Sequence, residues 1–246
     1  MKIVIIGRGN VATNLQYAFA KRRIKAEMVS SREGLADLLV ADVYIYAVRD
    51  EALQEVIDTV IAGAQERRQT AVLNALHLHT SGTMPLSVFG SVLPHAGVLY
   101  FFQTFSKAHL VEDFTQIPAF VEGRQTDDVG ALFTLAQTLT PHVYEASQHD
   151  RERLHVAGVF ANNFTNQMYA LAADMLKNTH IPFQVLLPLI DQTAEKVHHL
   201  MPKEAQTGPA KRGDGRVMQH HLSILQTEEQ RALYRLVSSM IQQETN

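Results

Sequence analysis

The chain has 246 residues, 46% of them hydrophobic and 19% charged, so its composition is that of a globular protein and excludes a disordered chain. Its formal net charge is −3 and its basic residues alternate with acidic ones, which gives no stripe for successive phosphates and no expectation of a nucleic-acid partner. It contains no cysteine, which excludes disulfides, a thiolate nucleophile and Cys-ligated metals.

The chain begins with Met1, and the apolar run at residues 3–6 is too short for the core of a signal peptide. We therefore expect a cytoplasmic protein. Twelve histidines include the pairs 77/79, 198/199 and 220/221, but no pair has a matching set of partners and no His-Glu-x-x-His spacing occurs. We expect no metal site.

Short β-branched runs alternate with amphipathic helical patterns in the first part of the chain, as in βαβ units around a parallel sheet. The expected strands occupy residues 2–6, 27–30, 43–48, 71–78, 98–102, 119–121 and 142–145. The expected helices include residues 11–21, 51–62 and 127–139. We predict an α/β domain with a Rossmann-type parallel sheet over residues 1–147.

The first strand runs into the motif GRGNVA at residues 7–12, which also opens a helix. This is the G-x-G-x-x-A form of the dinucleotide fingerprint, although a plain turn between strand and helix can have the same letters. Gly7 permits a tight turn, Gly9 lets the backbone approach a pyrophosphate, and the helix N-terminus attracts the anion. The expected cofactor-binding residues of this loop are Gly7, Arg8, Gly9, Asn10 and Val11.

The second strand ends in Ser30, Ser31 and Arg32. Folds that prefer NAD usually place an acidic residue near this point to bind the ribose 2′-hydroxyl. Two hydroxyls and a guanidinium suit a 2′-phosphate instead, so we predict NADP(H) as the cofactor. The alternative for Arg32 is a solvated residue at a strand end.

Two further segments follow predicted strands and meet the same edge of the sheet, where ligands of such folds gather. Ala47, Val48 and Arg49 are expected beneath the cofactor. After the next strand, His79 and Ser81 belong to the sequence HTSG, whose hydroxyls bind either the nicotinamide ribose or substrate, unless this segment is simply a turn that closes the strand.

After residue 147 the strand pattern ends, and helices are predicted over residues 150–177, 183–200, 215–225 and 227–242. We therefore assign residues 148–246 to an all-α domain that binds substrate and dimerises. Thr227 and Gln230 have the spacing of a capping box. Residues 154–173 carry no charge, but their amides, His155 and Thr165 are too costly for a bilayer, so we expect no membrane span.

His155, Val159, Asn162 and Asn166 share one face of the first of these helices. Polar residues on an otherwise uncharged helix indicate a face that lines a wet cleft. The alternative is a set of amides that join helices through buried hydrogen bonds.

These motifs together resemble NADP oxidoreductases with a Rossmann domain of the pyrroline-5-carboxylate reductase and deazaflavin-dependent NADP oxidoreductase type, followed by a helical domain of unknown function. The most specific pieces are residues 79–82, 102–106, 162–166 and 207–214. The resemblance implies a helical domain like the C-terminal domain of 6-phosphogluconate dehydrogenase, a homodimer joined through that domain, and a substrate site that includes Gln103, Thr104 and Asn166.

The related β-hydroxyacid dehydrogenases place a catalytic lysine three residues before a pair of asparagines, where this chain has Val159. Because this chain lacks that lysine, a reductase of this kind requires another proton donor. A histidine side chain is the usual proton donor near neutral pH, and His155 lies one turn away, so we predict His155 as the general acid and Asn162 as the residue that orients substrate; His79 and a water molecule are the alternatives.

Residues 208–216 combine glycines with Lys211 and Arg212, which suits an anion clamp for a substrate carboxylate or phosphate, or equally an exposed connection between helices. The sequence thus predicts an NADPH-dependent reductase of a carbonyl or imine on a small, anionic metabolite. The alternative is a non-catalytic sensor of NADP(H), which the missing lysine favours slightly.

Overall fold

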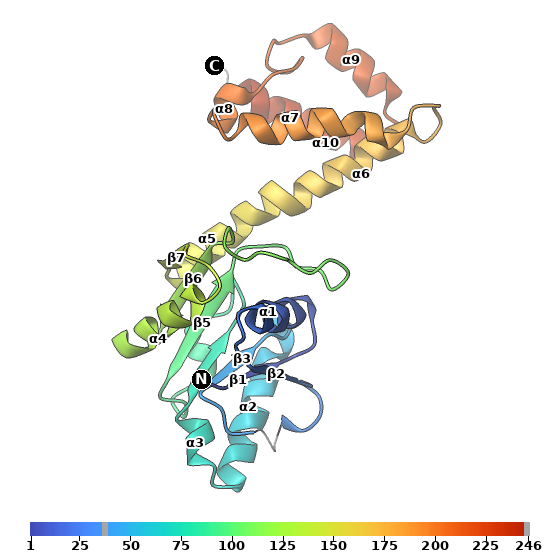
Figure 1. Cartoon of the computed structure of the whole chain (residues 1–246). Helices are drawn as coiled ribbons and strands as arrows, with labels where there is room; N and C mark the ends of the chain where they lie inside the picture. The colour runs from blue at the N-terminus through green and yellow to red at the C-terminus, as the bar shows by residue number, and fades with distance from the viewer. Residues whose placement is uncertain (36–38, 244–246) are drawn as a thin grey trace. The chain divides into compact units, whose positions relative to one another are not determined.

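The computed structural model describes residues 1–35 and 39–243, and the chain forms two compact units, Met1–Gln167 and Met168–Asn246 (Figure 1). The sequence placed the boundary earlier, after residue 147. The structure differs because the helix that follows this point, α5 (Gln148–Gly158), is anchored to the sheet by the fully buried side chain of Arg151. The first unit therefore contains more than the predicted Rossmann domain.

A seven-stranded sheet forms the centre of the first unit, in the order β2-β1-β3-β4-β5-β6-β7. Strands β1 to β5 are parallel, as predicted, whereas β6 runs antiparallel to β5 and parallel to β7. The strand bounds are β1 Ile3–Ile6, β2 Ala26–Val29, β3 Val43–Tyr46, β4 Leu76–His79, β5 Ala96–Phe101, β6 Ala119–Gly123 and β7 Val143–Glu145.

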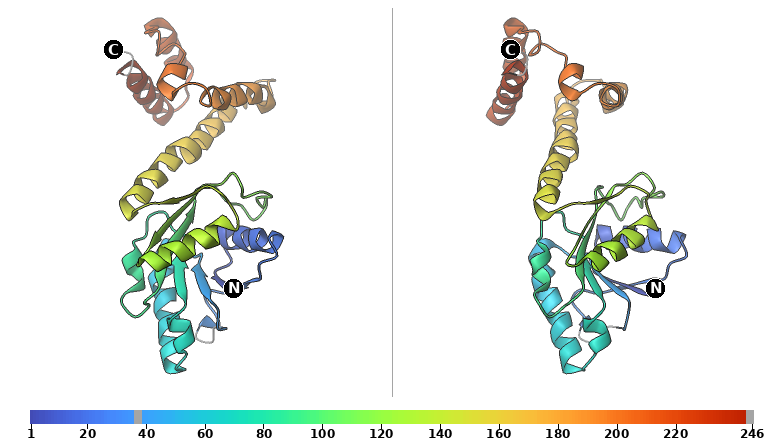
Figure 2. Two further views of the ribbon diagram at one scale, coloured as in Figure 1. Left: turned by 60° about the vertical axis from the view of Figure 1, so that its left-hand side comes forward. Right: turned by 90° about the vertical axis from the view of Figure 1, so that its left-hand side faces the viewer.

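Both faces of this sheet are covered by helices, because successive side chains of a strand point to opposite faces. Ile3 and Ile5 of β1 pack with α1 (Asn10–Lys21) and α4 (Thr126–Gln137) in one core. Val4 and Ile6 pack with α2 (Asp50–Glu66) in the other core. The right-hand view of Figure 2 shows the sheet between α2 on one side and α1 with α4 on the other.

The strand predicted over residues 71–78 is half wrong. Its first part is the short helix α3 (Thr70–Leu73), and β4 begins only at Leu76. Val72 is buried in the core from this helical turn, and its carbonyl oxygen accepts a hydrogen bond from His77 Nε2 at 2.8 Å. Tertiary packing therefore overrides the β preference of the local sequence. The 3-10 helix η2 (Leu86–Phe89) lies between β4 and β5 and contributes Phe89 to the same core.

Fully buried Asn14 attaches the segment after β5 to helix α1. Its amide nitrogen donates to the carbonyl oxygens of Asn10 (2.9 Å) and Ser106 (3.0 Å), and its amide oxygen accepts from the backbone N–H of Val111 (2.9 Å). The backbone N–H of Lys107 donates to Asn10 Oδ1 at 3.3 Å. These bonds hold the segment over the start of α1 and thereby place its first residues at the carboxyl edge of the sheet.

The helix predicted over residues 150–177 is present but not uniform. It consists of α5, a π-helical segment η3 (Val159–Phe164) and α6 (Thr165–Leu176). A π-helical turn contains an extra residue, and such turns are frequent at functional sites. Asn162, which the sequence predicts to orient substrate, and its neighbour Asn163 both lie in this segment.

The second unit is helical, as predicted. Besides the rest of α6 it contains η4 (Phe183–Leu186), α7 (Leu187–Lys196), α8 (Pro202–Ala205), α9 (Gly215–Ile224) and α10 (Glu228–Gln243). The predicted capping box is confirmed: Thr227 N–H donates to Gln230 Oε1 at 3.2 Å, and Gln230 N–H donates to Thr227 Oγ1 at 3.2 Å. Within residues 1–35 and 39–243, no helix has the length and apolar character that crossing a membrane requires.

Candidate active site

A cavity of about 940 Å³ lies at the carboxyl edge of the sheet. The strand order reverses between β1 and β3, and ligands of open α/β sheets bind where it reverses. The loops that leave these two strands both line the cavity. Ten of the predicted cofactor-binding residues line it: Gly7, Arg8, Gly9, Asn10, Val11, Ser31, Arg32, Ala47, Val48 and Arg49.

The two glycines of the fingerprint are required for different reasons. Gly7 has a φ of +127°, and a Cβ there would collide with the carbonyl group of Ala47, so the fold itself requires this glycine. Gly9 has an ordinary φ of −79°, and the nearest atom to a Cβ there would be Ala47 O at 3.9 Å. The fold thus leaves room for a side chain at position 9. A glycine at position 9 is explained if a pyrophosphate approaches the backbone closely, because a side chain would then be in its way. The loop therefore fits a dinucleotide.

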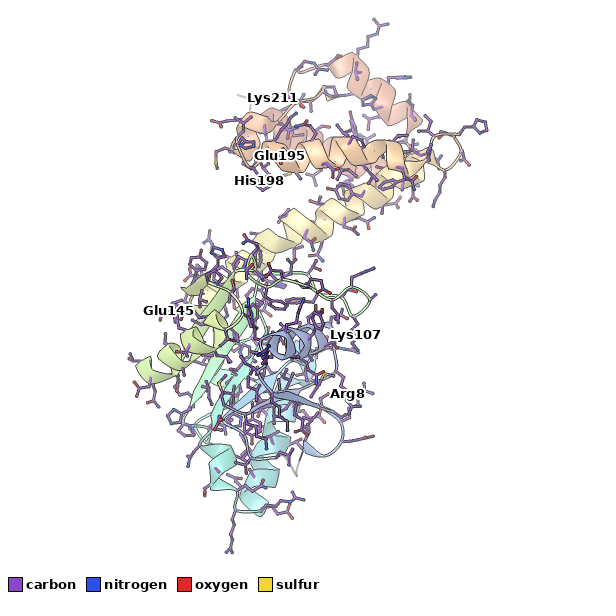
Figure 3. The ribbon with its side chains drawn as sticks, viewed as in Figure 1. Arg8, Lys107, Glu145, Glu195, His198 and Lys211 are labelled. Atoms are coloured by element: carbon purple, nitrogen blue, oxygen red, sulfur yellow. The ribbon has the colours of Figure 1, made fainter. Side chains whose placement is uncertain are left out.

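Helix α1 supplies the positive end of its dipole to this cavity. Gly9 is its N-cap residue, no side chain caps the helix, and its first turn contains no acidic residue. N–H groups at such an end are available to an anion, and the helix dipole favours the negative charge. Arg8 projects from the same loop, as Figure 3 shows, and lines the cavity.

At the end of β2, Ser31 and exposed Arg32 line the cavity, whereas Ser30 does not. Ser30 Oγ accepts a hydrogen bond from the backbone N–H of Arg32 at 3.2 Å. Ser30 therefore stabilises the turn that leads to Arg32, and its contact with the cofactor stays a prediction.

The loop after β4 also differs from the prediction, because Thr80 lines the cavity but His79 and Ser81 do not. His79 is 1% exposed, and burial lowers its pKa to about 4, with a further contribution from the positive charge of Arg151. His79 is therefore neutral at pH 7 and shielded from solvent. Ser81 Oγ accepts from the backbone N–H groups of Thr83 (3.1 Å) and Met84 (3.0 Å), which closes the turn.

A second cavity of about 410 Å³ adjoins the first, since Asn10 and Val11 line both. It contains the predicted residues His155 and Asn162 from the helix and Gln103 and Thr104 from the segment after β5. Residues not singled out for it from the sequence also line it: Tyr100, Phe102, Phe105, Gly158, Ala161 and Asn163. The structure thus joins two helix residues and two loop residues that lie far apart in the sequence.

Three predicted substrate residues do not line this cavity. Asn166 is exposed on α6, after the π-helical segment, which changes the side-chain spacing that the prediction assumed. Lys211 and Arg212 belong to the second unit, in the turn before α9 (Figure 3). In that turn the backbone N–H of Arg212 donates to Gly208 O at 3.2 Å, and Asp214 caps α9 through Val217 N–H at 3.1 Å.

Tyr100 is the functional candidate that the sequence did not reveal. Its hydroxyl group lies 3.1 Å from His155 Nδ1. Burial raises the pKa of Tyr100, so its phenol keeps its proton at neutral pH. The only local signal is a tyrosine near the carboxyl end of a predicted strand, which does not distinguish a site residue from a core residue.

No metal-binding group of three or more His, Asp or Glu side chains occurs in the part of the chain that the structure describes. His77 uses both ring nitrogens in hydrogen bonds, to Val72 O and to the hydroxyl group of Tyr46 at 2.9 Å.

The family model of a domain of unknown function, DUF2520, matches residues 117–241. An NADP oxidoreductase candidate from Bacteroides fragilis is 40% identical, with 98% of each chain covered and a TM-score of 0.87. The chain therefore belongs to the DUF2520 family. The resemblance inferred from the sequence is therefore confirmed. A comparison with curated proteins gave no match.

Two structures with lower sequence identity share the fold of the present chain. A protein from Thermotoga maritima is 16% identical, with 99% of this chain and 98% of that chain covered and a TM-score of 0.71. The pyrroline carboxylate reductase from Plasmodium falciparum, solved with NADP bound, is 9% identical, with both chains fully covered (100%) and a TM-score of 0.59.

The geometry at Gly9 predicts that Gly9→Ala separates dinucleotide binding from stability. The variant should fold with a free energy of unfolding within about 1 kcal/mol of the parent, since the new methyl group meets nothing closer than 3.9 Å. It should bind NADPH at least about tenfold more weakly, a difference of about 1.4 kcal/mol. Thermal unfolding and calorimetric titration measure the two quantities.

Gly130→Ala on α4 is the matched control, because a Cβ there meets no atom within 4 Å. This variant should retain NADPH affinity. If Gly9→Ala binds NADPH as tightly as the parent does, the cavity is not a pyrophosphate site of the expected kind.

Proposed function

We propose that the protein is an NADP(H)-dependent oxidoreductase that reduces a carbonyl or imine group of a small, anionic metabolite. The observation that carries this proposal is the junction of two cavities at Asn10 and Val11: one has the dinucleotide loop, and the other has His155 and amide side chains. When bound, NADPH supplies a hydride. The chain itself must hold both reactants, exclude competing groups and supply a proton.

The dinucleotide is NADP(H). Ser31 and Arg32 lie where the adenosine ribose binds in this fold, and a planar guanidinium matches a 2′-phosphate in a forked geometry. The Bacteroides relative is described as an NADP oxidoreductase, and the Plasmodium relative was solved with NADP.

The second cavity supplies the groups that reduction of a polar double bond requires. His155 offers an imidazole, and the amides of Gln103, Asn162 and Asn163 offer hydrogen bonds that orient a small polar molecule. Val159 also lines the cavity and cannot transfer a proton. We assign the general acid function to His155 and substrate orientation to Asn162.

The first test concerns cofactor preference. NADPH should raise the melting temperature more than NADH at equal concentration, because a ligand at a hundred times its dissociation constant stabilises by about 2.7 kcal/mol. Arg32→Ala should remove most of this difference. Arg22→Ala, at the far end of α1, is the control and should preserve it. Equal shifts for both cofactors in the parent would contradict the 2′-phosphate assignment.

The second test concerns turnover. NADPH oxidation is followed with pyruvate, 2-oxoglutarate and 1-pyrroline-2-carboxylate as probes of keto acids and cyclic imines. His155→Gln should retain its fold and NADPH affinity but lose at least about a hundredfold in kcat. His149→Gln, an exposed histidine on α5, is the control and should turn over normally. A parent that binds NADPH and oxidises none with any probe favours the sensor instead.

The third test concerns assembly, because we also propose a homodimer joined through the helical unit. Within the described residues 168–243, Ala210 is the single buried apolar residue, whereas Leu189, Val237 and Met240 are 65%, 42% and 54% exposed. A helical unit without a core of its own gains stability by burying these side chains against a second copy. Sedimentation velocity should show a dimer at micromolar concentration, and a monomer would contradict the proposal.

A further inference from the structure

Two side chains from separate elements, Tyr100 of β5 and His155 of α5, meet at the wall of the second cavity. The Tyr100 hydroxyl and His155 Nδ1 are 3.1 Å apart, and the ring centroids are 6.2 Å apart. Both residues line the cavity, so this hydrogen bond is accessible to a molecule bound there.

Glycines make room for this pair on two sides. A Cβ on Gly82 would lie 2.9 Å from Tyr100 Cζ and 3.0 Å from His155 Nδ1, too close for any other residue without a shift. A Cβ on Gly158 would lie 2.7 Å from Cε2 of Phe102, whose ring packs edge-on against Tyr100 at a centroid distance of 6.1 Å. The surrounding chain therefore fixes the phenol and the imidazole against each other.

The two partners differ in their exposure. Tyr100 is partly buried, and its phenol is un-ionised at neutral pH. His155 is exposed. A partly buried phenol beside a solvent-accessible imidazole provides the two groups that a short proton path requires: a proton-bearing group at the cavity wall and a neighbour that exchanges protons with water.

We infer that Tyr100 gives its hydroxyl proton to the substrate and that His155 restores this proton. The inference rests on the proposed function and changes one assignment in it, since His155 then acts through Tyr100. As hydride arrives at the electrophilic carbon, the π electron pair of the C=O or C=N bond moves to the heteroatom, which takes the proton from the Tyr100 O–H bond.

The phenolate oxygen of Tyr100 then takes the proton from Nδ1 of protonated His155, and the imidazole regains a proton from water. One hydride and one proton are consumed per product, and both side chains return to their starting states. An imidazolium that donates to the tyrosine oxygen also stabilises the negative charge that develops there.

The test uses Tyr100→Phe in the full chain, with the three probe substrates named above. We expect kcat to fall by about 10²- to 10⁴-fold, the usual effect of losing a general acid, while NADPH affinity and melting temperature stay unchanged. Tyr144→Phe is the matched control, because it removes the same hydroxyl from a 50% exposed tyrosine that stacks on Phe120. This control should turn over like the parent.

The outcomes separate the relay from the proposed function. If Tyr100→Phe turns over normally while His155→Gln does not, His155 donates directly, so the relay is wrong and the reductase assignment stands. If the parent oxidises no NADPH with any probe, both are wrong.

A measurement without substrate tests the hydrogen bond itself. The NMR titration of the His155 ring should shift in Tyr100→Phe and stay unchanged in Tyr144→Phe. A His155 titration that is identical in the parent and in Tyr100→Phe would overturn the relay, because the two groups would then not be coupled in solution.

Discussion

The ion pair of the buried Arg151 guanidinium is the interaction on which the second cavity depends. The side chain is fully buried; it pairs with Glu122 of β6 and donates to the carbonyl oxygens of Met84 (2.9 Å) and Ala146 (3.4 Å). A buried charge is tolerated only when it is paired and hydrogen-bonded, so the loop after β4, strand β6 and helix α5 are constrained together. His155 lies one helical turn after Arg151, and this anchoring sets its position.

Helix α1 connects the two cavities in a similar way. Its N-terminal N–H groups face the dinucleotide cavity, while Asn10 and Asn14 bind the segment that carries Gln103 and Thr104. One short helix therefore positions the glycine-rich loop and one wall of the second cavity. A shift of this helix would change both sites together, which suits a reaction in which hydride donor and acceptor must be aligned closely.

The dinucleotide site could be predicted from the sequence because its signal is local. Gly7, Gly9 and the start of α1 lie within a few residues of each other, and their order after a strand already defines the loop. The errors have physical causes. Ser30 and Ser81 satisfy nearby backbone N–H groups, and His79 is buried in the sheet. Each is a polar residue near the carboxyl edge of the sheet, as predicted. However, the serine side chains are hydrogen-bonded within turns, and the histidine side chain is buried.

Tyr100 could not be found from the sequence for a different reason. Its partner His155 is 55 positions away, and their contact depends on sheet order, on Arg151 and on space left by Gly82 and Gly158. Of the helical face proposed from α-helical spacing, His155, Val159 and Asn162 line the cavity, and Asn166 does not. The spacing rule stopped applying at η3, where the backbone leaves α-helical geometry.

The π-helical segment also affects how sequences of this family should be compared. Because each residue of an α-helix turns by about 100° and a π-helical turn contains one residue more, loss of one residue within Val159–Phe164 would restore regular α-helix and leave the following side chains at the same angular phase. A one-residue gap at this point in an alignment would therefore leave the flanking residues on the same helix faces and remove one residue from the turn that carries Asn162 and Asn163.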